Sequence, residues 1–182
     1  MDIKIKSALI SVSDKSGLDV VIKKLHEEEV KLISTGGTAQ FIRDMDIPVT
    51  DVSDITNFPE MMDGRIKTLH PNIHGGLLAV RDNQGHKESQ EEYNIENIDL
   101  LIVNLYPFEN TVNTGAKDEI CVENIDIGGP AMLRSASKNH RYVCVISDIS
   151  DYSNLIDELN KNVGKTSLDF RTKCAAVTFE RT

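Results

Sequence analysis

The stretch IDLLIVNLYPF, residues 98–108, contains the most strand-like run in the chain, and its core at 100–103 has no polar residue. A strand with one exposed face alternates apolar and polar residues, whereas a parallel strand covered on both faces is apolar throughout. Shorter runs at 7–13, 30–34, 47–52 and 142–147 are also interpreted as strands. The chain is therefore predicted to contain a mostly parallel sheet with helices on both faces.

Segments with helical periodicity separate these strands. In residues 16–29, Leu18, Val21, Ile22 and Leu25 recur at the spacing of one helix face. Further helices are predicted at 38–45, at 82–93, after the Gly-Gly-Pro turn of 128–130, around 155–159 and at 168–179. Such alternation is typical of a doubly wound α/β fold, in which ligands bind beyond the carboxyl ends of the strands. Residues 1–182 are predicted to form one domain.

The composition restricts the partners. With 29 acidic against 20 basic residues, the formal net charge is −9. An acidic protein binds nucleic acids and anionic membranes weakly, so neither is expected as a partner. Three cysteines without metal-ligand spacing are interpreted as reduced thiols, and no apolar segment suits a membrane span or signal peptide. We expect a cytoplasmic protein whose positive groups converge locally on a small anionic ligand.

Two loops after predicted strands have the features of an anion site. SVSDKSG provides Lys15 before a helix, and STGGTA combines Gly36 and Gly37 with the hydroxyls of Thr35 and Thr38. Free backbone N–H groups at a helix N-terminus, together with the helix dipole, favour a bound phosphate. Either loop alone is equally well explained as an ordinary helix cap. Two such loops at adjacent strand ends favour the phosphate site.

Two further strand ends carry polar groups. Asn104 and Tyr106 follow the apolar run, although such residues often only satisfy nearby backbone groups. Asp126 precedes the Gly-Gly-Pro turn, and Arg134 and Lys138 follow it four residues apart on one helix face. A lone lysine near a helix end is usually a surface residue. This pattern alone does not decide its role.

The stretch MDGRIKTLHPNIHGG, residues 62–76, concentrates donor groups in a span too irregular for one helix or strand. It contains Arg65 and Lys67, which predict a local cradle for an anion. His70 and His74 are four residues apart, but a proline separates them and no carboxylate has suitable ligand spacing. We expect no metal here, and predict that the histidines and Asn72 brace the loop.

Together, SVSDKSGL, STGGTA, MDGRIKTLHPNIHGGLL, DLLIVNLYPF and IDIGGPAMLRSASKNH resemble the IMP cyclohydrolase domain of bifunctional AICAR transformylase/IMP cyclohydrolase. The similarity runs in order from about residue 7 to the end. It implies a methylglyoxal-synthase-like α/β fold and a homodimer. The family's proteins continue into a larger transformylase domain, which is absent here, so a chain ending within a helix at FERT is expected to be truncated.

The resemblance implies that the domain closes the second purine ring. In FAICAR, a ribonucleotide monophosphate, the carboxamide nitrogen attacks the neighbouring formyl carbon, and loss of water gives IMP. No cofactor or metal is required. The implied catalytic residues are Lys67, Tyr106, Asp126 and Lys138. The implied substrate-binding residues are Ser11, Ser13, Lys15, Ser34, Thr35, Gly36, Gly37, Thr38, Arg65, Thr68, Asn104 and Gly128.

The difficulties of the reaction suggest roles for these groups. An amide is a poor nucleophile, so Asp126 is expected to accept a hydrogen bond from the carboxamide N–H and help remove its proton. The formyl oxygen becomes anionic, so Lys67 or Lys138, with N–H groups of the Gly-Gly turn, is expected to stabilise it and protonate the leaving water. Two alternatives remain open: an enzyme that eliminates phosphate from a small sugar phosphate, and an allosteric nucleotide-binding module.

Overall fold

The computed structural model describes residues 1–59, 61–106 and 108–182. Its main feature is a five-stranded sheet with the order β4-β3-β2-β5-β6, and every neighbouring pair is parallel. The strands are β2 (Ser7–Val12), β3 (Lys31–Ser34), β4 (Thr50–Asp51), β5 (Leu100–Asn104) and β6 (Cys144–Ile146). The predicted doubly wound parallel architecture is confirmed.

The order of the strands reverses beside β2. The chain passes outward from β2 through β3 to β4, and then returns to place β5 on the other side of β2. Ile10 pairs with Ser34 and Val12 pairs with Asn104, so the carboxyl ends of the three strands are aligned. Crossover connections leave on opposite sides of the sheet at such a switch point, which opens a crevice there.

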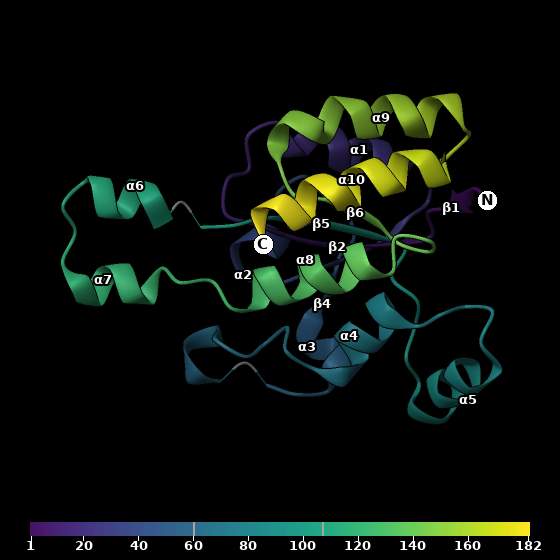
Figure 1. Ribbon diagram of the computed structural model, residues 1–182, viewed down its shortest axis with the longest axis horizontal. Coiled ribbons are helices and arrows are strands. Elements are labelled where there is room, and N and C mark those ends of the chain that lie inside the picture. Colours follow the sequence, from purple (N-terminus) through teal and green to yellow (C-terminus); the bar gives the residue numbers. More distant parts are fainter. Residues whose placement is uncertain (60, 107) are drawn as a thin grey trace.

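Alternate strand residues pack on opposite faces of the sheet. Ala8 and Ile10 belong to one buried cluster, and Leu9 belongs to the other. Helices α1 (Leu18–Glu27) and α9 (Tyr152–Lys161) cover the first face, and α4 (Pro71–Leu78) and α8 (Gly128–Lys138) cover the second (Figure 1). Helix α10 (Leu168–Arg181) packs against α8 and β6. Both faces are therefore apolar, as the uninterrupted strand at 100–103 predicts.

Several local elements differ from the sequence-based expectation. Helix α2 (Gly36–Arg43) begins at the first glycine, two residues before the predicted start. Residues within the supposedly irregular stretch form α4, because Pro71 is well suited to the first turn of a helix. The third strand has only two residues and leads directly into α3 (Val52–Thr56). A second, antiparallel pair, β1 (Ile3–Lys4) with β7 (Lys165–Thr166), was not expected.

The largest unexpected feature is an arm formed by α6 (Phe108–Asn113) and α7 (Asp118–Glu123), which projects from the body beyond β5 (Figure 1). Helix α5 (Gln84–Tyr93), the predicted charged helix, lies at the opposite end of the molecule. The remaining elements are the short 3-10 helices η1 (Met62–Gly64) and η2 (Ile149–Asp151). The arm follows the carboxyl end of β5, which lies beside the end of β2 at the crevice. The arm therefore begins next to the crevice.

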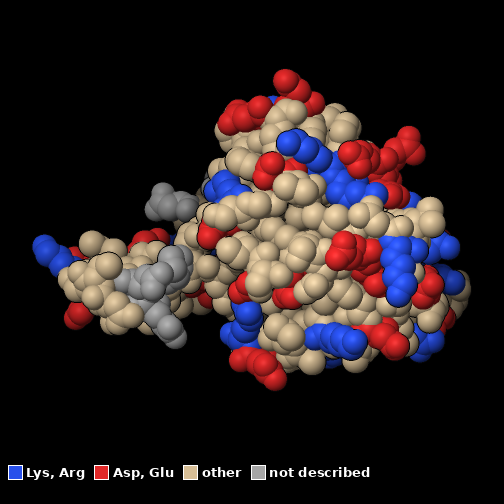
Figure 2. Space-filling model, turned by 90° about the horizontal axis from the view of Figure 1, so that it is seen from above, with Lys and Arg blue, Asp and Glu red and all other residues tan. Residues whose placement is uncertain are grey.

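The surface matches the mixed composition. Figure 2 shows acidic and basic side chains interspersed over the face that it presents, with the arm projecting to one side. Within the described ranges, we find no helix whose length and hydropathy would suit a membrane crossing.

One fully buried charge connects the two ends of the chain. The Arg171 side chain on α10 has 0% relative exposure. Its guanidinium donates to the carbonyl oxygens of His140 (2.8 Å), Arg141 (2.9 Å), Met1 (2.9 Å) and Thr166. Burial lowers its pKa. These bonds satisfy a buried cation with backbone oxygens, and they join α10 to the N-terminus and to the α8–β6 connection.

Replacing this residue tests its structural importance. Arg171→Leu should lower the free energy of unfolding by at least about 3 kcal/mol, because several buried carbonyl groups lose their donors. Urea denaturation followed by circular dichroism measures the change. Lys173→Leu, an exposed position on the same helix, is the control and should change stability by less than about 0.5 kcal/mol. Equal effects of the two substitutions would contradict this role for Arg171.

Candidate active site

A cleft of about 810 Å³ lies at the carboxyl ends of β2, β3 and β5. Its walls come from the loops after these strands, from the loop at 64–68 and from residues 122–129. This is the position that the reversal in strand order favours. The predicted site residues that line it are Ser11, Ser13, Lys15, Thr35, Gly36, Gly37, Thr38, Arg65, Lys67, Thr68, Asn104, Tyr106, Asp126 and Gly128.

The N-terminus of α2 lies at one end of this cleft with two lysines beside it. Gly36 has a positive φ of 53°, which a residue with a side chain rarely adopts. A Cβ atom at this position would lie 3.4 Å from Lys67 Nζ, and one on Gly37 would lie 3.9 Å from Lys15 Nζ. The two ammonium groups and the positive end of the helix dipole therefore converge on one location, as an anion site requires.

The Asn104 side chain braces the loop that carries Lys15. Its Oδ1 accepts the backbone N–H groups of Ser13 (2.7 Å) and Asp14 (3.0 Å), and its Nδ2 donates to the Asp14 carbonyl (2.7 Å). Asn104 was predicted to bind or orient a ligand. Both ends of its amide are hydrogen-bonded to the β2–α1 loop, and the residue also lines the cleft, so its contact with a ligand stays a prediction.

Ser34 and Thr38 are also committed to the backbone. The Ser34 side chain is fully buried, its hydroxyl donates to the Ile10 carbonyl at 2.7 Å, and it is not among the residues that line the cleft, although it was predicted to bind a ligand. The Thr38 hydroxyl accepts the Val12 N–H at 3.2 Å and lies 3.1 Å from the Val12 carbonyl. Of the three hydroxyls in this loop, Thr35 remains the best candidate for contact with a ligand.

A carboxylate and a glycine turn form the other side of the cleft. Asp126 Oδ1 accepts the Gly129 N–H at 2.8 Å at the start of α8. One of the two turn N–H groups expected to face a ligand is therefore already bonded to Asp126. A Cβ on Gly128 would lie 2.6 Å from Thr68 Oγ1, so only glycine fits there. The turn at 128–129 and the loop at 64–68 are in direct contact.

Residues 122–125, at the end of the arm, line the cleft next to the glycine turn. Val122, Glu123 and Ile125 line the cleft, and Glu123 forms an ion pair with Arg65 from the opposite wall. Both charged side chains are largely exposed, so the pair contributes little stability. Tyr106, which precedes the arm, also lines the cleft and is 54% exposed. The arm residues were missed from the sequence because helices of six residues have almost no recognisable periodicity.

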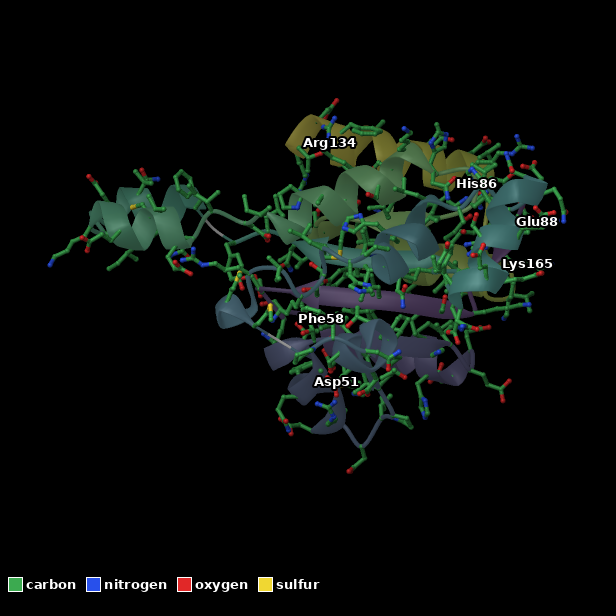
Figure 3. The ribbon with its side chains drawn as sticks, turned by 90° about the horizontal axis from the view of Figure 1, so that it is seen from below. Asp51, Phe58, His86, Glu88, Arg134 and Lys165 are labelled. Carbon is green, nitrogen blue, oxygen red and sulfur yellow. The ribbon has the colours of Figure 1, made fainter. Side chains whose placement is uncertain are left out.

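Lys138 lies outside the cleft. It is exposed in the last turn of α8, and a rise of 1.5 Å per residue separates it from Gly128 by about 15 Å. Arg134, on the same helix face, stacks over the Phe179 ring of α10 at 5.5 Å from the ring centroid. Arg134 thus lies against α10 (Figure 3), whereas Lys138 is exposed. The place of Lys138 in the fold does not support direct contact with a ligand in this cleft.

The histidines of the 62–76 stretch have separate partners. His70 caps α4 by accepting the Asn72 N–H at 3.2 Å, while Asn72 Nδ2 donates to the Ile55 carbonyl at 2.9 Å. His74 Nδ1 lies 3.0 Å from Ser135 Oγ. Across the part of the chain that the structure describes, we find no group of three or more side chains placed to hold a metal ion.

Comparison with known families agrees with this geometry. A model of the MGS-like domain family matches residues 17–131. The chain belongs to this family. A second model, described as the AICARFT/IMPCHase bienzyme, matches residues 136–182. The two matches together cover most of the cleft walls, although β2 and the loop that carries Lys15 precede the first match. The family resemblance predicted from the sequence motifs is confirmed.

Relatives of this MGS-like domain include two bacterial proteins named bifunctional purine biosynthesis protein PurH. The one from Cereibacter sphaeroides is 57% identical over 96% of this chain, and the one from Parvibaculum lavamentivorans is 57% identical over 98%. The chain spans about one third of the length of each (33%). The crystal structure of ForH superposes with a TM-score of 0.82 and 30% identity, covering 97% of this chain and 92% of that one.

The structural role of the Thr38 hydroxyl, which holds the backbone of Val12 in this MGS-like domain, can be tested. Thr38→Val preserves the side-chain shape but leaves the buried Val12 N–H without its partner, so it should lower the free energy of unfolding by about 1–2 kcal/mol. Thr35→Val is the matched control, because Thr35 makes no capping hydrogen bond through its side chain. Urea denaturation measures the free energy of unfolding of both variants. An equal or larger decrease for Thr35→Val would refute the structural role of Thr38.

Proposed function

We propose that this domain is an IMP cyclohydrolase, which closes the ring of FAICAR to give IMP. The observation that carries the proposal is that one cleft holds two ammonium groups at a helix N-terminus and, on its other side, a carboxylate beside a glycine turn. The first group suits a nucleotide 5′-phosphate and the second suits the reacting base. The names of the PurH relatives, which place those proteins in purine biosynthesis, support it.

The chemistry demands little beyond positioning and proton transfer. The carboxamide nitrogen and the formyl carbon belong to the same molecule, so holding both arms in an attack geometry removes much of the barrier. The carboxamide nitrogen forms a bond to the formyl carbon and loses one proton. In the dehydration, a nitrogen of the adduct loses a second proton as a carbon–nitrogen double bond replaces the broken C–O bond, and the former formyl oxygen leaves with both protons as water. The resident groups must therefore provide a base, a donor to the developing oxyanion and an anchor for the phosphate.

We assign Asp126 as the base. Its Oδ1 is held by the Gly129 N–H, which fixes the carboxylate, and Oδ2 is the oxygen assigned to the carboxamide N–H. Tyr106 is assigned to the oxyanion, because this residue lines the same cleft and Lys138 does not. A phenol can donate a hydrogen bond to the oxygen as charge develops.

The position of Lys67 changes the role expected from the sequence. Its Nζ lies beside Gly36 at the start of α2, which is the phosphate end of the cleft. A remote phosphate contact contributes similar energy in the ground and transition states, so it affects binding more than turnover. We therefore propose Lys67 as a phosphate anchor together with Lys15.

Lys67→Met and Lys15→Met separate the two roles. Each should raise the Kd for IMP by about tenfold to a hundredfold, the effect of losing one charge-assisted hydrogen bond, and lower saturated turnover much less. Calorimetry gives the Kd, and steady-state rates on FAICAR give the turnover. Lys87→Met, exposed on the distant helix α5 (Figure 1), is the control. If the Lys67 variant loses turnover but retains its affinity for IMP, Lys67 stabilises the oxyanion and is not a phosphate anchor.

The reaction itself is tested with purified protein and synthetic FAICAR. The expected result is formation of IMP, with loss of the activity in Asp126→Asn. Release of inorganic phosphate from a small sugar phosphate, without IMP formation, would identify a phosphate-eliminating enzyme instead. Tight binding of IMP with no turnover of either substrate would identify an allosteric module.

From the family resemblance we further propose a cytoplasmic homodimer that forms part of a longer chain with a transformylase domain. The word "bifunctional" in the names of relatives three times as long supports the fusion. Sedimentation velocity measures the oligomeric state, and a monomer at micromolar concentration would contradict the dimer for this domain.

A further inference from the structure

His74 has an environment that its place outside the cleft does not explain. It lies in α4, half-buried, with Nδ1 3.0 Å from Ser135 Oγ on α8. Its Nε2 is fully buried and, among the described residues, has no partner at ordinary hydrogen-bond geometry. Burial lowers the pKa of the imidazole, and the Thr68 backbone opposes this decrease. A neutral ring thus lies between α8 and the backbone of the loop at 64–68.

The hydrogen-bonding groups around the ring select one tautomer. The Ser135 hydroxyl reaches both the Ala131 carbonyl (2.9 Å) and His74 Nδ1. In a helix the Ala131 carbonyl also accepts the Ser135 N–H, so it does not need the hydroxyl hydrogen. If Nδ1 were protonated instead, a bare and buried Nε2 would face the Thr68 backbone without a donor, which is costly. The tautomer that accepts at Nδ1 and carries the proton on Nε2 would leave no ring nitrogen without a possible partner.

Thr68 is the residue through which this contact reaches the site. It is 6% exposed, and its Oγ1 is in contact with Gly128 at the start of α8. The preceding residue, Lys67, extends to Gly36 at the start of α2. The peptide that joins Lys67 and Thr68 therefore lies between two side chains that reach the starts of α2 and α8.

We propose that His74 is a positioning residue, whose Nε2–H donates to the Thr68 carbonyl and fixes the peptide of Lys67 and Thr68 between α2 and α8. The catalytic consequence rests on the proposed cyclohydrolase function, whereas the tautomer of His74 does not. Misplacing reacting groups by about 1 Å can lower turnover by as much as a hundredfold.

Two substitutions distinguish positioning from simple packing. In His74→Gln the amide nitrogen replaces Nε2, whereas in His74→Asn it is too short to reach Thr68. We expect His74→Asn to lower turnover of FAICAR by about tenfold or more and His74→Gln to retain it within about threefold. Urea denaturation of both variants shows whether their stabilities match. His26→Gln, on an exposed position of α1, is the control and should leave turnover unchanged.

A second measurement does not depend on activity. Long-range ¹H–¹⁵N correlation spectra of the imidazole identify the protonated nitrogen, and we expect Nε2–H with a neutral ring at pH 7. An Nδ1–H tautomer overturns the proposal whatever the kinetics. Equal turnover in the Gln and Asn variants also overturns it. If the wild-type protein does not convert FAICAR, the proposed function fails, and the spectrum alone then decides for or against the His74–Thr68 hydrogen bond.

Discussion

The pairing of β2 with β5 is the constraint on which the rest of the structure depends. It aligns five residues of each strand, from Ala8 opposite Leu100 to Val12 opposite Asn104, across about ninety residues of chain. Because these strands are buried on both faces, a register shift of one residue would exchange the two apolar clusters and is strongly disfavoured. The same pairing brings Asn104 to the loop that carries Lys15. The fold and the anion site are thus fixed by one register.

Many polar side chains around the cleft are hydrogen-bonded to backbone groups of the protein. Thr38, Asn104 and Asp126 each accept backbone N–H groups of neighbouring loops or of a helix start. This arrangement leaves few side chains for direct contact with a ligand, but it keeps those few in fixed positions before the ligand arrives. Rigid donors do not have to reorganise during a reaction, which is the main advantage of a preorganised site.

Most of the sheet and much of the site could be predicted from the sequence, for identifiable reasons. The uninterrupted apolar run at 100–103 indicates a strand covered on both faces, and polar residues placed just after such strands meet at one edge. Lys15 was predicted in this way, whereas Asp126 follows helix α7 and was predicted from the Gly-Gly-Pro turn that it precedes. The catalytic role of Lys138 was implied by the family resemblance and not by its spacing, because periodicity gives a helix face but not the neighbour that this face meets. The hydrogen bonds of Thr38 to Val12 could not be foreseen, since they depend on a tertiary contact between helix α2 and strand β2.

The arm gives the cleft two walls of unequal stability. Helix α7 has no buried residue, so few apolar contacts oppose its local opening, whereas the helix and strand ends around Lys15 belong to the core. Free energies of opening in such a domain should therefore fall steeply from the phosphate end of the cleft to the arm. Hydrogen exchange would be slow at one wall and fast at the other. A ligand would be held by a stable framework at its phosphate and enclosed by a wall whose order depends on the ligand itself.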